Sequence, residues 1–113
     1  MKTTLLLLIV LLTTFSCTRE KVTPIDQQCN ATISFSNDVM PILEANCISC
    51  HQPGNTSGGY DLSSYSAIAA NANAIVGSMK ASSYLLMPLG GPALPDSTIQ
   101  KISCWIEQGK QDN

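Results

Sequence analysis

Residues 47–51 read Cys47-Ile48-Ser49-Cys50-His51, and this run decides how the rest of the chain is interpreted. Two thiols three positions apart can reach the two vinyl groups on one edge of a haem and form a thioether with each. The histidine that follows can place an imidazole nitrogen on the iron. The C-x-x-C-H spacing therefore predicts one covalent haem c with its iron, held by Cys47 and Cys50, with His51 as an iron ligand.

Two other uses of these cysteines have weaker support in the sequence. A redox-active C-x-x-C needs a βαβ setting, and no strand pattern follows the motif. A zinc site could use Cys29, Cys47, Cys50 and Cys104, but its two outer cysteines are single rather than a second C-x-x-C pair. His51 is the only histidine in the chain, and it occupies the one position that the haem motif requires.

Residues 1–16 are interpreted as a signal peptide of the lipoprotein type. Lys2 precedes an unbroken apolar run at 5–12, and small polar residues follow it. A membrane-spanning helix needs about 20 apolar residues, so the run is too short for one. Cys17 stands where a lipid would be attached, although Thr14 replaces the leucine usual at that position in such signals. We expect an exported bacterial protein, either a membrane-anchored lipoprotein or a soluble periplasmic form.

The polar residues 17–28 contain a proline and no periodic pattern, which predicts a tether to one domain at 29–113. The formal net charge is −2, with no cluster of lysine or arginine. Nucleic acid is therefore a poor partner, and contact with a membrane is expected only through a lipid on Cys17.

The chain has five cysteines, an odd number for an exported protein. A lipid on Cys17 and a haem on Cys47 and Cys50 would leave two thiols in an oxidising compartment. We therefore hypothesise a disulfide between Cys29 and Cys104.

Helical periodicity predicts an all-α domain with about three helices around one buried group. The first helix has an N-cap at Asp38 or Ser36, Pro41 in its first turn, and one apolar face that leads into the C-x-x-C-H motif. That face is formed by Val39, Ile42 and Leu43.

Two further helices are expected after the motif. The second begins near Ser63 or Ser64 and is ended or bent by Gly77. The third opens at Asp96 as N-cap and stops at Gly109. Their expected buried residues are Tyr65, Ile68, Ala72, Ile75 and Val76 on the second, and Ile99, Ile102 and Ile106 with Trp105 nearby on the third. No segment alternates with the period of a strand.

With no second histidine, the other iron ligand must be a different residue or the position is open. Met40 falls on the helix before the motif, and Met79 falls near a helix end, where methionine ordinarily packs in the core. Met87 lies in the run YLLMPLGGPALP, whose prolines and glycines prevent regular structure, so a loop can project its thioether. Met87 is the expected ligand, with Met79 or an open site as alternatives. His/Met ligation favours a comparatively high reduction potential.

Four stretches together resemble small bacterial monohaem cytochrome c domains. They are FSNDVMPILEANCISCH at 35–51, GGYDLSSY at 58–65, MPLGGPAL at 87–94 and W-I-x-x-G at 105–109. The resemblance covers nearly all of residues 30–109. It implies the cytochrome c fold, with the first and last helices crossing beside the haem.

The resemblance also implies that Cys47 and Cys50 bind the haem, with His51 as proximal and Met87 as distal ligand. With both iron positions filled, we expect an electron carrier rather than an enzyme, with no small-molecule substrate and with redox proteins of the cell envelope as partners. The alternative is a haem-based sensor or ligand-binding module in which Met87 is displaceable. A haem peroxidase is a poor interpretation, because this chain has no second histidine for acid–base catalysis.

Overall fold

The computed structural model of the chain describes residues 29–113. The expected signal peptide, lipid on Cys17 and tether fall on residues 1–28 and lie outside the described residues. The elements follow one another as η1 (Phe35–Val39), α2 (Met40–Asn46), β1 (His51–Gln52), β2 (Asn55–Thr56), η2 (Ser57–Gly59), α3 (Tyr65–Met79) and α4 (Asp96–Glu107). The prediction of a helical domain with three α-helices is confirmed for this part of the chain.

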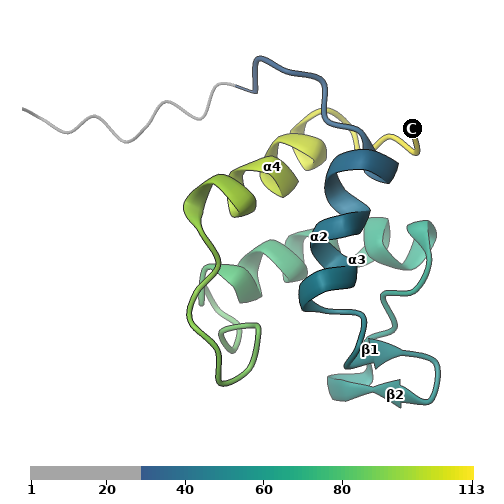
Figure 1. The fold of residues 1–113 in the computed structure, drawn as a ribbon, viewed down its shortest axis with the longest axis vertical. Coiled ribbons are helices and arrows are strands. Elements are labelled where there is room, and N and C mark those ends of the chain that lie inside the picture. Colours follow the sequence, from purple (N-terminus) through teal and green to yellow (C-terminus); the bar gives the residue numbers. More distant parts are fainter. Residues whose placement is uncertain (1–28) are drawn as a thin grey trace, which may run out of the picture.

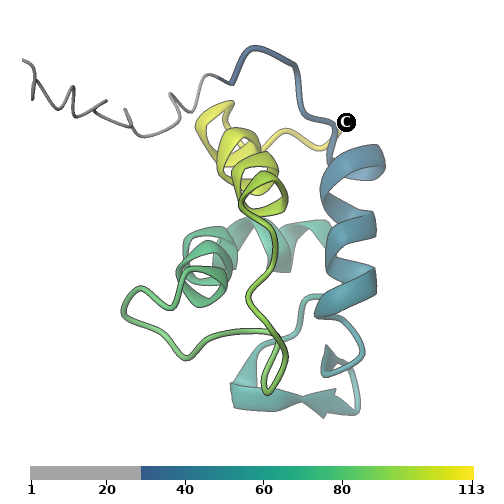
Figure 2. The same cartoon turned by 60° about the vertical axis from the view of Figure 1, so that its left-hand side comes forward.

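The helices form two sides of a small domain. Segments η1 and α2 make one upright helix, and α3 and α4 lie side by side against it (Figures 1 and 2). The long connection between α3 and α4 and the β1–β2 hairpin lie at one end of the domain, and the C-terminus lies at the opposite end. Among the described residues, no helix combines the length and apolarity needed to cross a membrane.

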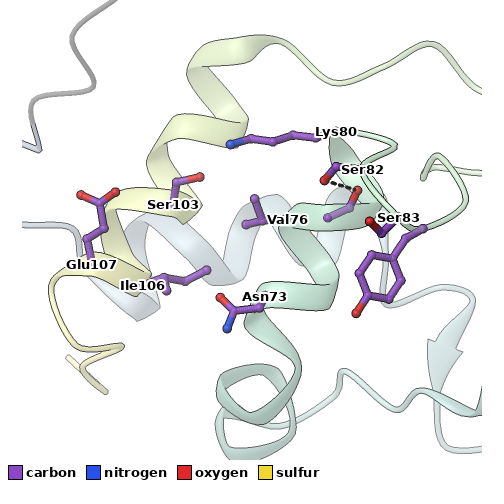
Figure 3. A pocket seen from close by; sticks show the side chains of 10 residues that line it. Asn73, Val76, Lys80, Ser82, Ser83, Ser103, Ile106 and Glu107 are labelled. Atoms are coloured by element: carbon purple, nitrogen blue, oxygen red, sulfur yellow. Dashed lines mark hydrogen bonds between the residues drawn. The ribbon is translucent and has the colours of Figure 1, made fainter.

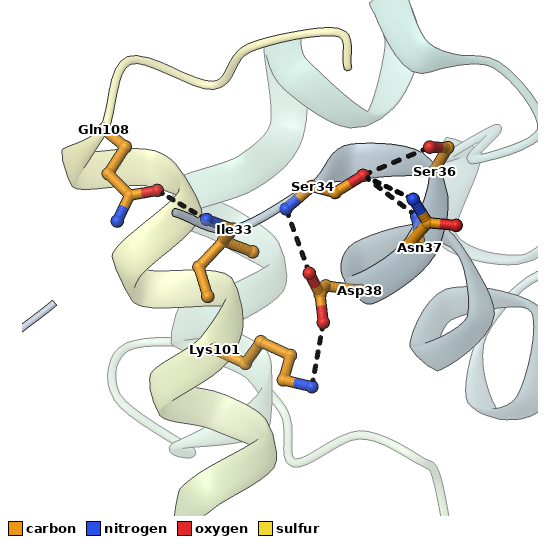
Figure 4. Close-up of polar contacts among 7 residues, drawn as sticks. All are labelled: Ile33, Ser34, Ser36, Asn37, Asp38, Lys101 and Gln108. Atoms are coloured by element: carbon orange, nitrogen blue, oxygen red, sulfur yellow. Dashed lines mark hydrogen bonds and ion pairs between the residues drawn. The ribbon is translucent and has the colours of Figure 1, made fainter. Parts of the chain in front are cut away.

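The first helix begins earlier than the sequence predicted. Ser34 is its N-cap: the side-chain oxygen accepts from the N–H of Asn37, and the N–H of Ser34 donates to Asp38 at 3.0 Å (Figure 4). The expected cap at Asp38 or Ser36 is therefore wrong. Asp38 lies inside the first turn, and its carboxylate accepts a hydrogen bond from the backbone N–H of the true cap residue, Ser34. Lys101 of α4 lies 3.1 Å from the same carboxylate.

The first turns of this helix are π-helical. Val39 N–H donates to the carbonyl of Ser34, and Met40 N–H donates to that of Phe35, both five residues back. Pro41 follows directly and has no N–H to donate, so a wider turn before it loses no hydrogen bond. The sequence analysis expected Pro41 in the first turn of the whole helix. It lies instead at the start of α2, after the π-helical segment η1.

The three helices meet in one apolar core. Phe35 packs edge-on against Tyr65, with ring centroids 5.0 Å apart, and lies 5.5 Å from the Trp105 ring. The buried indole N–H of Trp105 donates to the carbonyl of Gln111. The largest fully buried side chains are Trp105, Leu43, Ile68, Ile102 and Val39. Helical periodicity had placed the last four inside and Trp105 only near the buried face. Burial of each stabilises the fold by about 1.5–3 kcal/mol.

Helix α3 starts where expected and ends later. Ser64 is its N-cap, with the hydroxyl accepting from the N–H of Ala67. The prediction that Gly77 ends or bends the helix is wrong, since α3 continues to Met79 and Gly77 lies buried inside it. The residue is a glycine because the Tyr84 ring occupies the place of a side chain: a Cβ on Gly77 would lie 2.5 Å from Cδ2 of Tyr84.

Helix α4 has one predicted and one corrected end. Pro95, not Asp96, occupies the N-cap position, and Asp96 is the first helical residue, where a carboxylate still favours the helix dipole. At the other end Gly109 has a φ of +93°. Its N–H donates to Ile106, and the N–H of Lys110 donates to Trp105, which is the Schellman arrangement expected for a terminal glycine.

A disulfide joins the start of the described chain to the last helix. Cys29 and Cys104 are bonded, with their Cα atoms 5.2 Å apart, as the cysteine accounting predicted. Next to it, Gln108 of α4 accepts from the N–H of Ile33 at 2.9 Å (Figure 4). The side-chain Nε2 of Gln108 also donates to the carbonyl of Ala31 at 2.8 Å, so the segment that leads into η1 is attached to α4 and its C-cap residue by one covalent bond and two hydrogen bonds.

Candidate functional site

The candidate site begins where α2 ends. The N–H of Cys47 donates to the carbonyl of Leu43 at 2.8 Å, and the N–H groups of Cys50 and His51 both donate to the carbonyl of Cys47 at 3.1 Å. The chain thus makes one further tight turn after the helix. This turn brings together three of the four residues predicted to form the site.

A short hairpin follows the turn, although no strand was expected. Strands β1 and β2 pair antiparallel, with His51 opposite Thr56, and the turn between them contains Gly54 at a φ of +89°. Strands of two residues are too short to show an alternating pattern in the sequence. The pairing fixes the backbone of His51, whose carbonyl also accepts from the N–H of Leu62 at 2.7 Å.

The imidazole of His51 is oriented by a backbone carbonyl. Its Nδ1 lies 3.3 Å from the oxygen of Tyr60. Because a carbonyl can only accept, this hydrogen bond places the proton on Nδ1 and leaves the lone pair on Nε2. A histidine held in this way is typical of metal ligands, since the outer hydrogen bond fixes both tautomer and ring orientation.

The two motif cysteines are free thiols in different surroundings. Cys47 is half-buried and Cys50 is exposed. Burial, together with the neighbouring Cys50, raises the pKa of the Cys47 thiol to about 11. Redox-active C-x-x-C pairs instead contain a cysteine of lowered pKa. Cys47 therefore lacks this feature of a thiol–disulfide exchange centre.

The zinc alternative loses two of its four sulfurs. Cys29 and Cys104 are committed to the disulfide, so they are not available as thiolate ligands. Within residues 29–113, no three side chains of histidine, cysteine, aspartate or glutamate converge in a way that could hold a metal ion. The motif cysteines would have to bind zinc with ligands of another kind.

The two candidate methionines lie in different environments. Met79 is 2% exposed and packs in the apolar core at the end of α3, as expected. Met87 is half-buried in the connection between α3 and α4, and its N–H donates to the carbonyl of Ser78 at 3.1 Å. The peptide bond from Met87 to Pro88 is cis. Both views place this connection at the hairpin end of the domain, where His51 begins β1 (Figures 1 and 2).

Apolar side chains are exposed at this end of the molecule. Leu85 is 65% and Leu89 is 71% exposed, on either side of Met87, and Tyr60 is 40% exposed after the hairpin. Exposed large hydrophobic side chains commonly contact a ligand or partner where they form a contiguous patch. Two free thiols on one turn, an oriented imidazole and flanking apolar side chains are a chemically suitable set for a covalently attached, largely apolar ring.

The hollow between α3 and α4 is a different feature. It has a volume of about 560 Å³ and lies beside Val76 and Lys80 of the α3 end and Ser103 and Glu107 of α4 (Figure 3). Its lining contains no cysteine, histidine or methionine. We therefore place the candidate site at the C-x-x-C-H turn and not at this hollow.

Sequence reasoning missed the groups that hold the site in place. The carbonyl of Tyr60 orients His51, and the carbonyl of Ser78 holds the backbone of Met87. Backbone carbonyls leave no signal in a residue pattern. The hairpin did have a signal in the sequence, because Pro53-Gly54 is a dipeptide typical of tight turns.

Compared with protein-family models, with curated proteins and with solved structures, the chain gave no match.

Proposed function

We propose that this protein transfers electrons through one covalently bound haem c. Cys47 and Cys50 form the two thioethers, His51 is the proximal iron ligand and Met87 the distal one. The observation that carries the proposal is the single turn on which two free thiols and an imidazole with an available Nε2 lie together.

The arrangement of helices supports a cytochrome c-like fold. Helix η1–α2 leads directly into the C-x-x-C-H turn, and it packs against the last helix through the Phe35 and Trp105 rings. The first and last helices thus support each other through η1, at the end of the first helix that lies away from the turn. The fold inferred from the sequence resemblance requires such a pairing.

The residues of the site have separate roles in this mechanism. A bound haem supplies one-electron chemistry between ferrous and ferric iron. His51 donates Nδ1–H to the Tyr60 carbonyl, which leaves Nε2 available to hold the iron and would make the imidazole a better electron donor. The soft thioether of Met87 favours the ferrous state and raises the potential. With His51 and Met87 as its two protein ligands, the iron would have no open position for a substrate, which favours an electron carrier over an enzyme.

Location and partners follow from the sequence. We propose an exported bacterial protein, anchored by a lipid on Cys17 or soluble in the periplasm, whose partners are redox proteins of the cell envelope. The charge pattern supports protein partners over nucleic acid.

A haem-based sensor is the second candidate. Met87 lies in an irregular segment between two exposed leucines, Leu85 and Leu89, and a ligand on such a segment is easier to displace than one inside a helix. In that case Met87 would be a displaceable ligand that yields its place to a diatomic gas, and residues of its segment would carry the signal.

The test uses the full chain produced in a host that attaches c-type haem. A pyridine haemochrome assay measures covalent haem, and a reduced-minus-oxidised spectrum reports the ligands. We expect haem that survives denaturation, and a sulfur-to-iron charge-transfer band that disappears in Met87→Ala but persists in Met79→Ala. Protein without covalent haem would contradict the proposal, and tight carbon monoxide binding by the reduced protein would favour the sensor.

A further inference from the structure

The segment after α3 folds back on the last turn of that helix. The N–H of Ser82 donates to the carbonyl of Gly77 at 2.9 Å, and the N–H of Met87 donates to that of Ser78 at 3.1 Å. Figure 3 shows Ser82 and Ser83 beside the end of α3, whereas the side chain of Lys80 extends toward α4. Residues 80–87 are thus held against two consecutive carbonyls of α3, and Met87 is the last residue of this fold-back.

Two residues of the fold-back adopt a left-handed backbone. Ala81 has a φ of +51° and Ser83 a φ of +67°. Residues other than glycine rarely adopt this conformation, so the surrounding contacts must maintain it. The conformation of the segment is therefore set by its contacts with α3 and not by local preference.

The ring of Tyr84 makes the closest of these contacts. A Cβ built on Gly77 would lie 2.5 Å from Cδ2 and 2.8 Å from Cε2 of Tyr84, and 3.3 Å from the carbonyl oxygen of Ser82. Real Cβ atoms do not approach a ring so closely. Any side chain at position 77 would move the Tyr84 ring and press on the Ser82 backbone, both within five residues of Met87.

We propose that Gly77 is a positioning residue for Met87: by leaving room for Tyr84, it fixes the fold-back that presents the distal ligand. The inference rests on the proposed function, since it assigns a role in iron ligation. Gly77 and Tyr84 act through the backbone of residues 80–87 and do not touch the iron site themselves. They set how often the thioether is in place.

This role gives a quantity to measure. A loop that holds Met87 less firmly leaves the iron open for a larger fraction of the time, and a competing ligand binds in proportion to that fraction. Carbon monoxide affinity of the reduced protein therefore reports the open fraction. A purely structural role would change the stability of α3 but not this affinity.

The experiment compares Gly77→Ala with wild type, using pyridine haemochrome to confirm haem content in both. We expect about tenfold tighter carbon monoxide binding, a weaker sulfur-to-iron band and a lower reduction potential in the variant. Gly91→Ala is the matched control in the same segment. Its Cβ would meet the Pro88 carbonyl oxygen at 3.5 Å and the Pro88 Cβ at 3.8 Å, both ordinary contacts, so wild-type affinity is expected.

Tyr84 gives an independent route to the same answer. Tyr84→Ala is expected to tighten carbon monoxide binding, whereas Tyr84→Phe keeps the ring and should bind as wild type does. In the double variant Gly77→Ala/Tyr84→Ala, the ring that the new Cβ would displace is gone. The two effects should therefore be clearly less than additive.

Failure of the inference is distinguishable from failure of the proposed function. Wild-type protein without covalent haem, or with a sulfur-to-iron band that survives Met87→Ala, would overturn the proposed function and this inference with it. A wild type with Met87 ligation, together with unchanged affinity in Gly77→Ala, would overturn the inference alone. If Gly77→Ala yields too little haem protein, equal affinities in Tyr84→Ala and Tyr84→Phe would overturn it instead.

Discussion

Phe35, the first residue of η1, and Trp105 in α4 are in direct ring contact, with centroids 5.5 Å apart and ring planes at 35°. They lie near opposite ends of the described residues 29–113 and hold the first and last helices together. Trp105 is fully buried and Phe35 is 7% exposed. The stability of the domain should therefore depend strongly on this pair.

The first prediction concerns that contact. Phe35→Ala removes a buried ring and leaves a cavity against Trp105 and Tyr65, so the free energy of unfolding should fall by about 3–5 kcal/mol. Guanidinium unfolding of the haem-bearing protein measures it. Glu44→Ala, an exposed change on α2, is the control and should shift stability by less than about 0.5 kcal/mol. A loss below 1 kcal/mol for Phe35→Ala would contradict the packing described.

The second prediction concerns the disulfide. Cys29 and Cys104 are 75 positions apart in the sequence, and a cross-link closing such a loop stabilises by about 4 kcal/mol on the chain-entropy model, an upper value here because bound haem would also constrain the chain. Cys29→Ala should lower the free energy of unfolding by up to this amount. It leaves Cys104 as a buried thiol, which a thiol titration of the unfolded variant should count. If the denatured, unreduced wild type shows both thiols free, the pairing is wrong.

Much of the helical structure could be predicted because it is local. The buried positions Leu43, Ile68 and Ile102 follow directly from helical spacing, and Gly109 ends α4 for a reason intrinsic to glycine. The C-x-x-C-H residues lie on one turn because they are neighbours in sequence. These features depend on few contacts from elsewhere in the chain.

The errors have non-local causes. Gly77 was expected to end or bend α3, but the residue that explains it is Tyr84, which reaches back from the next segment. Asp38 was expected to cap the first helix; its carboxylate instead serves Ser34, which begins the helix earlier. The backbone N–H of Met87 donates to the carbonyl of Ser78. This hydrogen bond requires the chain to reverse after α3, and residue patterns do not specify that reversal.

The third prediction concerns pH. The N–H of Ser34, and then Lys101, hold the pKa of Asp38 below its ordinary value of 3.8. A carboxylate with a lowered folded pKa contributes stability above its unfolded pKa and loses it as the pH falls toward the folded value. Asp38→Asn should therefore be less stable than wild type near neutral pH, and the difference should shrink as the pH falls below 3.8.

Denaturant midpoints at about pH 6 and about pH 3 measure this effect. Glu44→Gln provides the control, because it removes an exposed carboxylate from the neighbouring helix α2. A gap between wild type and Asp38→Asn that stays constant across this range would show that Asp38 acts through shape and not through charge.

The last prediction concerns the end of α4. Gly109 has a φ of +93°, and a Cβ placed there would meet nothing within 4 Å. Gly109→Ala therefore introduces backbone strain without a steric clash, and it should lower the free energy of unfolding by about 1–2 kcal/mol. The Schellman hydrogen bonds to Ile106 and Trp105 depend on this conformation, so hydrogen exchange at the amides of residues 109 and 110 should speed up together with the loss of stability. Gly91→Ala, at a glycine without a left-handed φ, should change neither measurement. If Gly109→Ala matched the wild type in both, position 109 would not require the left-handed conformation, and the end of α4 would have to be held by the Cys29–Cys104 disulfide and the Gln108 contacts instead.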